Sequence, residues 1–142
     1  MNKSDTLNKV KRFYAVFDKK NIESLEDIYS DAIIFVDPFH QIEGIHSLKA
    51  YFGNLANNIN YCRFHFKHEA VSNDDIFLQW RMAFSHPKIK KGSALELDGV
   101  SHLVVREKII YHRDYFDSSE MLYKHIPVLG SLIRLIEKKM GA

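Results

Sequence analysis

The first part of the chain carries apolar residues at two different spacings. They recur every three or four positions over about residues 4–19, 22–29 and 45–57, which places them on one face of a helix and predicts three amphipathic helices. Residues 33–36 are instead an unbroken apolar run, rich in β-branched and aromatic side chains, which favours a buried strand. Pro38 ends that strand, because proline has no N–H to donate within a sheet.

From Tyr61 onward the pattern changes to a period of two, which is typical of strands. Four long strands are predicted, over about residues 61–71, 76–85, 95–106 and 108–116. A last helical region begins near Ser118 and ends near Met140. Helices followed by a long sheet predict an α+β fold, in which a curved, mostly antiparallel sheet covers the three helices and an extra helix ends the chain.

Composition narrows the class of protein. The length of 142 residues predicts one domain over residues 1–142, and the aromatic content of 13% suggests an aromatic-lined interior. A net charge of +2 is too small to indicate a nucleic-acid partner, and no apolar run approaches membrane-spanning length. Without an apolar leader after Met1 we expect a cytoplasmic protein, with neither nucleic acid nor membrane as a partner.

Asp37 is the first candidate for chemistry. It follows the apolar run directly and precedes Pro38, so it is expected at the end of a strand and at the lip of an apolar interior. Desolvation disfavours the charged form of an acid in such a place, which suits it to proton transfer near neutrality. The alternative is structural, because Asp-Pro is a common turn signal.

The predicted strand at 76–85 is apolar on both faces, so both need a cover. Alternation places Trp80, Met82 and Phe84 on one face and Gln79 and Arg81 on the other. Because Trp and Met are enriched in the cores of interfaces, we assign the first face to the outside of the sheet and to a homodimer interface. Arg81 and Gln79 are then expected on the inside.

The order of these elements, together with several short motifs, resembles the nuclear-transport-factor-2-like superfamily, and within it the SnoaL-like and ketosteroid-isomerase-like branch. The resemblance covers nearly the whole chain and rests on Lys11-Arg12-Phe13-Tyr14, Ile28-Tyr29-Ser30-Asp31-Ala32, Phe35-Val36-Asp37-Pro38, Glu43-Gly44 and residues 111–117. It implies a cone-shaped sheet wrapped around three helices, with a deep pocket between them. It also implies that Asp37 occupies the position of the isomerase's general base, which moves a proton next to a ketone.

The resemblance fails at the groups that stabilise the enolate oxygen in the isomerases, a tyrosine on the first helix and an acid on a late strand. Phe13 and Ser101 fall at those positions. Phenylalanine donates no hydrogen bond, and serine donates a weaker one than a protonated acid. Tyr14 is one step around the helix, about 100° away, so we expect it to point elsewhere. Steroid isomerisation is therefore not expected.

A second resemblance is to limonene epoxide hydrolase, which uses an arginine flanked by two aspartates. Arg81 and Asp114 fall near the arginine and the later aspartate, while Ala83 replaces the earlier one. By alternation we expect Arg81 and Asp114 to line the pocket as a pair. Such a pair either orients the polar end of a ligand or is a structural ion pair, and sequence alone leaves both open.

The remaining candidate ligand-binding residues surround these positions in the expected cone: Phe13, Phe17, Phe52, Gln79, Ser101, His112 and Phe116. His112 is also consistent with a core histidine bonded to a neighbour. No metal site is expected, because the eight histidines lack chelating spacing and His65 and His68 fall on opposite faces of a strand. Cys62 has no evident base partner, and no cofactor is expected.

The sequence therefore predicts a protein that binds a small hydrophobic molecule, with acid–base chemistry of the isomerase, cyclase, hydratase or hydrolase type at Asp37. The alternative is a module of the same fold that binds a ligand or another protein without catalysis. The basic amphipathic C-terminal segment is expected to pack across the sheet or the mouth of the cone rather than on a membrane.

Overall fold

A computed structural model describes residues 2–141. Its helical elements before the long strands are α1 (Lys3–Ala15), the 3₁₀ helix η1 (Lys19–Ser24), α2 (Leu25–Ile28) and α3 (Ile45–Asn58). The expected second helix is thus split in two. The first helix begins where the side chain of Asn2 accepts a hydrogen bond from the backbone N–H of Asp5, as an N-cap does.

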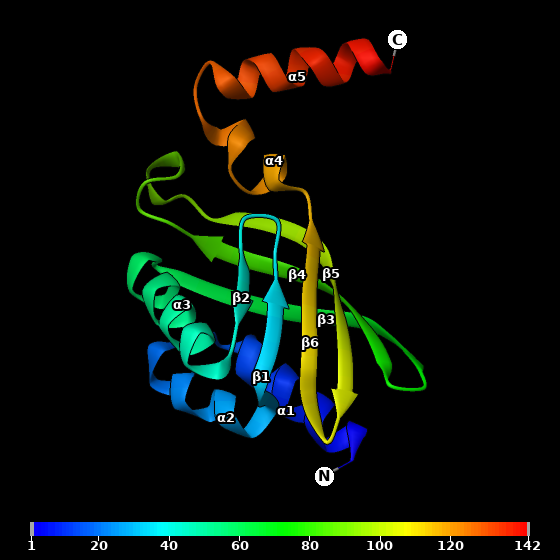
Figure 1. Ribbon diagram of the computed structural model, residues 1–142. Coiled ribbons are helices and arrows are strands. Elements are labelled where there is room, and N and C mark those ends of the chain that lie inside the picture. The colour runs from blue at the N-terminus through cyan, green and yellow to red at the C-terminus, as the bar shows by residue number, and fades with distance from the viewer. Residues whose placement is uncertain (1, 142) are drawn as a thin grey trace.

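A six-stranded sheet forms the other layer, in the order β2-β1-β6-β5-β4-β3. The strands are β1 (Tyr29–Val36), β2 (Gln41–Glu43), β3 (Tyr61–Ser72), β4 (Asp75–Ser85), β5 (Leu95–Arg106) and β6 (Lys108–Phe116). All neighbours are antiparallel except β1 and β6, which are parallel. The sheet is not closed. In Figure 1 β3 and β4 cross β1 and β6 steeply, so the sheet curves around the helices.

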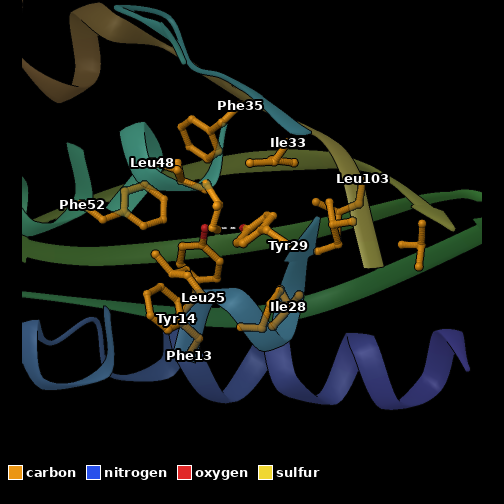
Figure 2. Close-up of a cluster of buried hydrophobic side chains, with 14 of the residues drawn as sticks. Phe13, Tyr14, Leu25, Ile28, Tyr29, Ile33, Phe35, Leu48, Phe52 and Leu103 are labelled. Carbon is orange, nitrogen blue, oxygen red and sulfur yellow. Dashed lines mark hydrogen bonds between the residues drawn. The ribbon is translucent and has the colours of Figure 1, made fainter. Parts of the chain in front are cut away.

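The main core fills the space between the helices and the concave face of the sheet. Leu25, Tyr29, Ile33, Leu48 and Leu103 are fully buried there. Figure 2 shows this cluster, in which aromatic side chains from α1 and α3 lie beside aliphatic ones from β1 and β5. The α+β prediction is confirmed, with β2 as an added short strand.

The assignment of the two faces of β4 was wrong. Trp80, Met82 and Phe84 are 1%, 5% and 3% exposed and lie on the inside of the sheet. They share that side with Phe64 and Phe66 of β3, whose partners across the strands are Met82 and Trp80. Alternation tells which residues share a face, but not which face is inside. These three side chains therefore do not form an outer dimer interface.

The chain ends in three short helical elements beyond the last strand, α4 (Ser118–Met121), η3 (Tyr123–His125) and α5 (Leu129–Met140). Figure 1 shows them stacked past the end of β6, with α5 farthest from the sheet and the β4–β5 connection, which contains η2 (Lys90–Gly92), at the same end of the molecule. No helix in residues 2–141 is long and apolar enough to cross a membrane.

Candidate functional site

A cavity of about 310 Å³ opens at the end of the sheet where α4 lies. Its walls are mainly aromatic and come from the helices and from the inner face of the sheet: Phe17, Phe35, Phe52, Phe64, Trp80, Met82, Phe84 and Phe116. The polar residues on its lining are Tyr14, Asp37, His40, Tyr51, Cys62, His86 and Asp114. A cavity with apolar walls and few polar groups is the usual form of a small-molecule site.

Asp114 on β6 lines this cavity, and its carboxyl group is hydrogen-bonded to side chains that lie between it and the core. Its Oδ1 accepts hydrogen bonds from Ser101 Oγ at 2.5 Å and pairs with His112 Nε2 at 2.6 Å. Trp80 Nε1 donates to the same serine oxygen at 2.9 Å. No side chain or backbone group of residues 2–141 hydrogen-bonds the other carboxylate oxygen, Oδ2. One oxygen of Asp114 is therefore anchored and the other is available to a ligand.

The hydrogen-bond chain continues from His112 into the core. His112 Nδ1 lies 2.7 Å from Tyr29 Oη, which lies 2.7 Å from Tyr14 Oη. Figure 2 shows the bond between the two tyrosines inside the apolar cluster. Burial, together with the negative charge of Asp114, raises the pKa of Tyr14 and of Tyr29, so both stay neutral.

One arrangement of protons satisfies every member of this chain. Tyr14 donates to Tyr29, Tyr29 donates to His112 Nδ1, and the His112 Nε2–H donates to an ionised Asp114. The indole N–H of Trp80 can only donate, so the Ser101 hydroxyl accepts a hydrogen bond from it. The same hydroxyl donates a hydrogen bond to Asp114 Oδ1. All donors then point toward one carboxylate, which stabilises its charge inside an apolar wall.

Asp37 borders the same cavity in a different setting. It begins the turn between β1 and β2, where its Oδ1 accepts from the backbone N–H groups of Phe39 and His40, both at 2.8 Å. Its Oδ2 accepts from Tyr51 Oη at 2.5 Å. Burial, together with this bond to Asp37, raises the pKa of the Tyr51 hydroxyl. Each oxygen of Asp37 therefore accepts at least one hydrogen bond, Oδ1 from the turn and Oδ2 from α3.

The other sequence-predicted pocket residues divide into three groups. Phe17, Phe52 and Phe116 line the cavity, as expected. Ser101 and His112 lie behind Asp114 rather than on the open wall, and they border a void of only about 10 Å³ next to it. Phe13 is buried against Phe52 at 6.1 Å between ring centroids and does not line the main cavity.

Arg81 and Gln79 lie on the outside of the sheet, so their expected place in the pocket is wrong. Arg81 Nε donates to Asp98 Oδ1 at 2.9 Å, and Asp114 is not its partner. Because Asp98 holds the guanidinium by a hydrogen bond and by its charge, it raises the pKa of Arg81, while the pKa of Asp98 is lowered. Gln79 is likewise exposed.

Sequence reasoning missed the tyrosines and the tryptophan of this site. Tyr14 was expected to point elsewhere than the pocket position matched by Phe13, but Tyr14 lines the cavity and Phe13 does not, and the Tyr14 ring lies 5.1 Å from Phe64 between centroids. Tyr29 was expected as the last residue of the second helix, but it is the first residue of the buried strand β1. Gly99 leaves room for the Trp80 side chain, because a Cβ at Gly99 would come within 2.3 Å of the indole ring. Cys62, buried at the cavity wall, has its pKa raised to about 12 by that burial.

The family is decided by a match of residues 10–112 to the model of the SnoaL-like domain. The chain belongs to the SnoaL-like family. Asp114 lies just beyond the matched residues, while Asp37, Tyr14 and Tyr29 lie within them. A search of curated proteins found no match for this SnoaL-like chain.

Solved structures share the fold at low sequence identity. A putative SnoaL-like polyketide cyclase from Jannaschia sp. CCS1 has a TM-score of 0.68 and 13% identity, over 80% of this chain and 86% of that one. A ketosteroid-isomerase-like protein from Catenulispora acidiphila, in complex with trimethylamine, has a TM-score of 0.71 and 14% identity, over 80% and 88%. TerC, co-crystallised with polyporic acid, has a TM-score of 0.69 and 16% identity, over 82% and 94%.

No metal centre accompanies the cavity in residues 2–141, where no three His, Cys, Asp or Glu side chains are grouped to hold an ion. Among the groups of this SnoaL-like site, the carboxylate of Asp114 borders the apolar cavity, and the imidazole of His112 is bonded behind it.

Proposed function

We propose that the cavity binds a small, largely apolar molecule and that Asp114 exchanges a proton with it. The observation that carries this proposal is the asymmetry of Asp114: Oδ1 is bonded to Ser101 and His112, while Oδ2 has no partner among residues 2–141. A carboxylate that is held on one oxygen and open on the other is positioned for general acid–base work.

The apolar walls support the first half of the proposal. Rings from Phe17, Phe52 and Phe116 face a space of about 310 Å³, enough for a compact ring system. Two structures of similar fold contain small ligands, trimethylamine in one and polyporic acid in the other. We infer a ligand with an apolar body and one polar or weakly acidic group that reaches Asp114.

The buried hydrogen bonds support the second half. When Oδ2 takes a proton from the ligand, the donors on Oδ1 no longer face a full negative charge, and when the proton returns they stabilise the carboxylate again. His112 and Ser101 keep the carboxyl group in one orientation throughout. The reaction class is proton transfer of the isomerase, cyclase or hydratase type, without a cofactor.

Asp37 remains a second candidate for the acid–base role because it also lines the cavity. Its three hydrogen bonds, two from the turn and one from Tyr51, favour a structural and orienting role instead. Three of the roughly four lone-pair sites of Asp37 already accept hydrogen bonds, against two at Asp114.

A ligand-binding protein without catalysis is the second candidate function, and the position of Arg81 favours it. With Arg81 on the outer face, no lysine or arginine of residues 2–141 lines the cavity, so a developing oxyanion would have no permanently charged cation beside it, only His40 and His86. Electrostatic stabilisation of such charge usually contributes more to catalysis than any other single effect.

Fluorescence of Trp80 tests binding, because it is the single tryptophan of the chain and lies on the cavity wall. We expect a panel of small aromatic ketones and phenols to change its emission in a saturable way. Exchange of the bound ligand's acidic C–H for deuterium, followed by NMR, then separates the two functions. Exchange that stops in Asp114→Asn supports the enzyme; binding with no exchange in either protein supports the binding module; no saturable binding refutes both.

A homodimer also remains a proposal, now through the true outer face of the sheet. That face exposes Phe77 and Tyr115 beside the pair of Arg81 and Asp98. Sedimentation velocity of Phe77→Lys beside the unchanged protein measures it. A wild-type protein that sediments as a monomer removes this proposal.

A further inference from the structure

The C-terminal helix α5 rests on the rest of the molecule through its polar side. Gly130 is buried, and a Cβ there would come within 2.3 Å of the Lys124 carbonyl oxygen. Arg134 Nη1 donates to that same carbonyl at 3.1 Å, and Lys124 Nζ lies 3.2 Å from Glu137 Oε1. The side of α5 that usually faces solvent is therefore the side that packs on η3.

The apolar side of α5 is consequently turned outward. Leu132, Leu135 and Ile136 are 52%, 50% and 52% exposed, and Met140 is 81% exposed. At 100° per residue these four lie on one arc, away from Gly130. The expectation that this segment packs across the sheet or the cone mouth is wrong, because α5 packs on η3 and lies farthest from the sheet (Figure 1). An outward stripe of large apolar side chains on a short helix needs an external partner.

The same end of the molecule carries unpaired positive charge. Lys138 and Lys139 follow the apolar stripe on α5, and neither forms an ion pair within residues 2–141. The β4–β5 connection adds Lys88, Lys90 and Lys91, which are exposed and also lack ion pairs among these residues. Figure 1 shows this connection and α5 at one end of the molecule.

The β4–β5 connection and the segment that leads from β6 toward α5 adjoin the mouth of the cavity. Ile89 of the β4–β5 connection and Met121 and Leu122 before η3 all line it. The exposed apolar stripe, the lysines and the opening to the cavity therefore belong to one end of the protein.

We propose that this end docks on the surface of an anionic lipid bilayer. The apolar stripe of α5 would insert at the headgroup boundary, and the lysines of α5 and of the β4–β5 connection would lie over anionic headgroups. Lys139 lies within the stripe, between Leu135 and Leu132 around the helix axis, so its stem would be buried beside them while its long side chain reaches the headgroups with the charge. This inference does not depend on the acid–base role of Asp114.

Charge favours a lipid surface over a second copy of the chain. The only acidic residue of α5 is Glu137, which Lys124 already holds, so a paired α5 would offer no carboxylate to Lys138 and Lys139. Pairing of α5 would also leave Lys88, Lys90 and Lys91 without a partner. An anionic bilayer offers negatively charged headgroups to the lysines of α5 and of the β4–β5 connection at the same time.

Co-sedimentation of the full chain with lipid vesicles tests the proposal. We expect binding to vesicles that contain phosphatidylserine, weaker binding at high salt, and little binding to pure phosphatidylcholine. Leu132→Glu/Ile136→Glu should weaken binding by at least about tenfold, because it removes the inserting side chains. Neutralising Lys88, Lys90 and Lys91 to Gln should weaken it by a similar factor.

A matched control neutralises Lys19 and Lys20 to Gln, two exposed lysines of η1 on the far side of the molecule from α5. This variant should bind vesicles as the unchanged protein does. Because every substituted side chain is exposed, circular dichroism should show unchanged folding. No binding to anionic vesicles, or equal loss in the control, overturns the proposal. Concentration-dependent dimers abolished by Leu132→Glu/Ile136→Glu, without vesicle binding, overturn it in favour of a second copy.

Discussion

Two carboxyl groups face one cavity, yet their surroundings differ. Asp37 accepts two backbone hydrogen bonds in the β1–β2 turn and a third from Tyr51, so both its oxygens are occupied. Asp114 is bonded on a single oxygen, by Ser101 and His112, and its other oxygen is open to the cavity. The two side chains are similarly buried, at 9% and 12% exposed, so burial does not distinguish them.

This difference is the reason why the proposed acid–base role is given to Asp114 and a structural role to Asp37. Bonds from backbone N–H groups stabilise a turn in every state of the protein and leave little capacity for a ligand. Side-chain donors behind a single oxygen fix the direction of a carboxyl group without occupying it. Position at the cavity wall does not distinguish the two acids, whereas the number of lone pairs still available to a ligand does.

The largest effect is expected from Asp114→Asn. This change keeps the shape of the side chain and removes the proton acceptor, so proton exchange with a bound ligand should fall by at least about 100-fold. Ligand affinity, measured by Trp80 fluorescence, should change much less. Exchange that survives this substitution would contradict the role given to Asp114. Asp37→Asn provides the comparison and should lower exchange by less than about tenfold; the reverse ranking would return the acid–base role to Asp37.

Asp37→Ala should act mainly on stability. It removes the acceptor for Phe39 N–H, His40 N–H and the Tyr51 hydroxyl, and the free energy of unfolding should fall by about 1–3 kcal/mol. Urea unfolding followed by circular dichroism measures this. An unchanged midpoint would mean that the turn is held without its carboxylate.

Alkaline pH should weaken the fold through the buried tyrosines. Tyr14 and Tyr29 have raised pKa values in the folded protein, while in the unfolded chain they ionise near pH 10. Stability from these groups is therefore intact below about pH 10 and falls above it, by about 1.4 kcal/mol per pH unit for each tyrosine. Urea unfolding between pH 8 and about pH 11 measures the slope.

Tyr29→Phe should make the free energy of unfolding fall less steeply above about pH 10, by the contribution of one tyrosine. Tyr115 is exposed, so Tyr115→Phe should leave the slope unchanged and serves as a control. Tyr51→Phe tests the Asp37 end of the cavity in the same way, since its hydroxyl pKa is also raised by burial. A flat stability above about pH 10 would show that the tyrosines ionise freely in the folded protein.

The smallest effect is expected from Arg81→Gln. Its partner Asp98 lies with it on the exposed face of the sheet, where ion pairs are screened by water. Ligand affinity and proton exchange should change by less than about twofold. A strong loss of either would place Arg81 in the function after all, despite its distance from the cavity wall.

Much of the fold followed from local patterns. The change from helical spacing to alternation at Tyr61 located the start of β3, and the helix predicted over 45–57 matches α3 (Ile45–Asn58). These features depend on residues close together in the chain, which a periodic pattern records directly. The short strand β2 was not predicted, because its three residues pair with β1 only once the turn at Asp37 has formed.

The site was predicted less well, because its residues come from segments far apart in the chain and a periodic pattern records only near neighbours. Asp37, Phe17, Phe52, Asp114 and Phe116 were rightly expected at the cavity, but Arg81 and Gln79 were placed on the wrong side of the sheet. A period of two sorts β4 into two sets and contains no information about which set meets the helices. The rotation argument gave the angle between Phe13 and Tyr14 but not which of the two faces the cavity, and Tyr14 is the one that lines it.

The sequence by itself determined the class of the protein, the order of its elements, the aromatic character of its interior and the candidate acids. Tertiary structure decided which face of β4 is inside, which of the two acids keeps an open oxygen, and which side of α5 meets solvent. Those three outcomes depend on contacts between distant segments, such as Tyr29 with His112 and Lys124 with Arg134. Local spacing cannot encode such contacts, because they exist only after the sheet has curved around its helices.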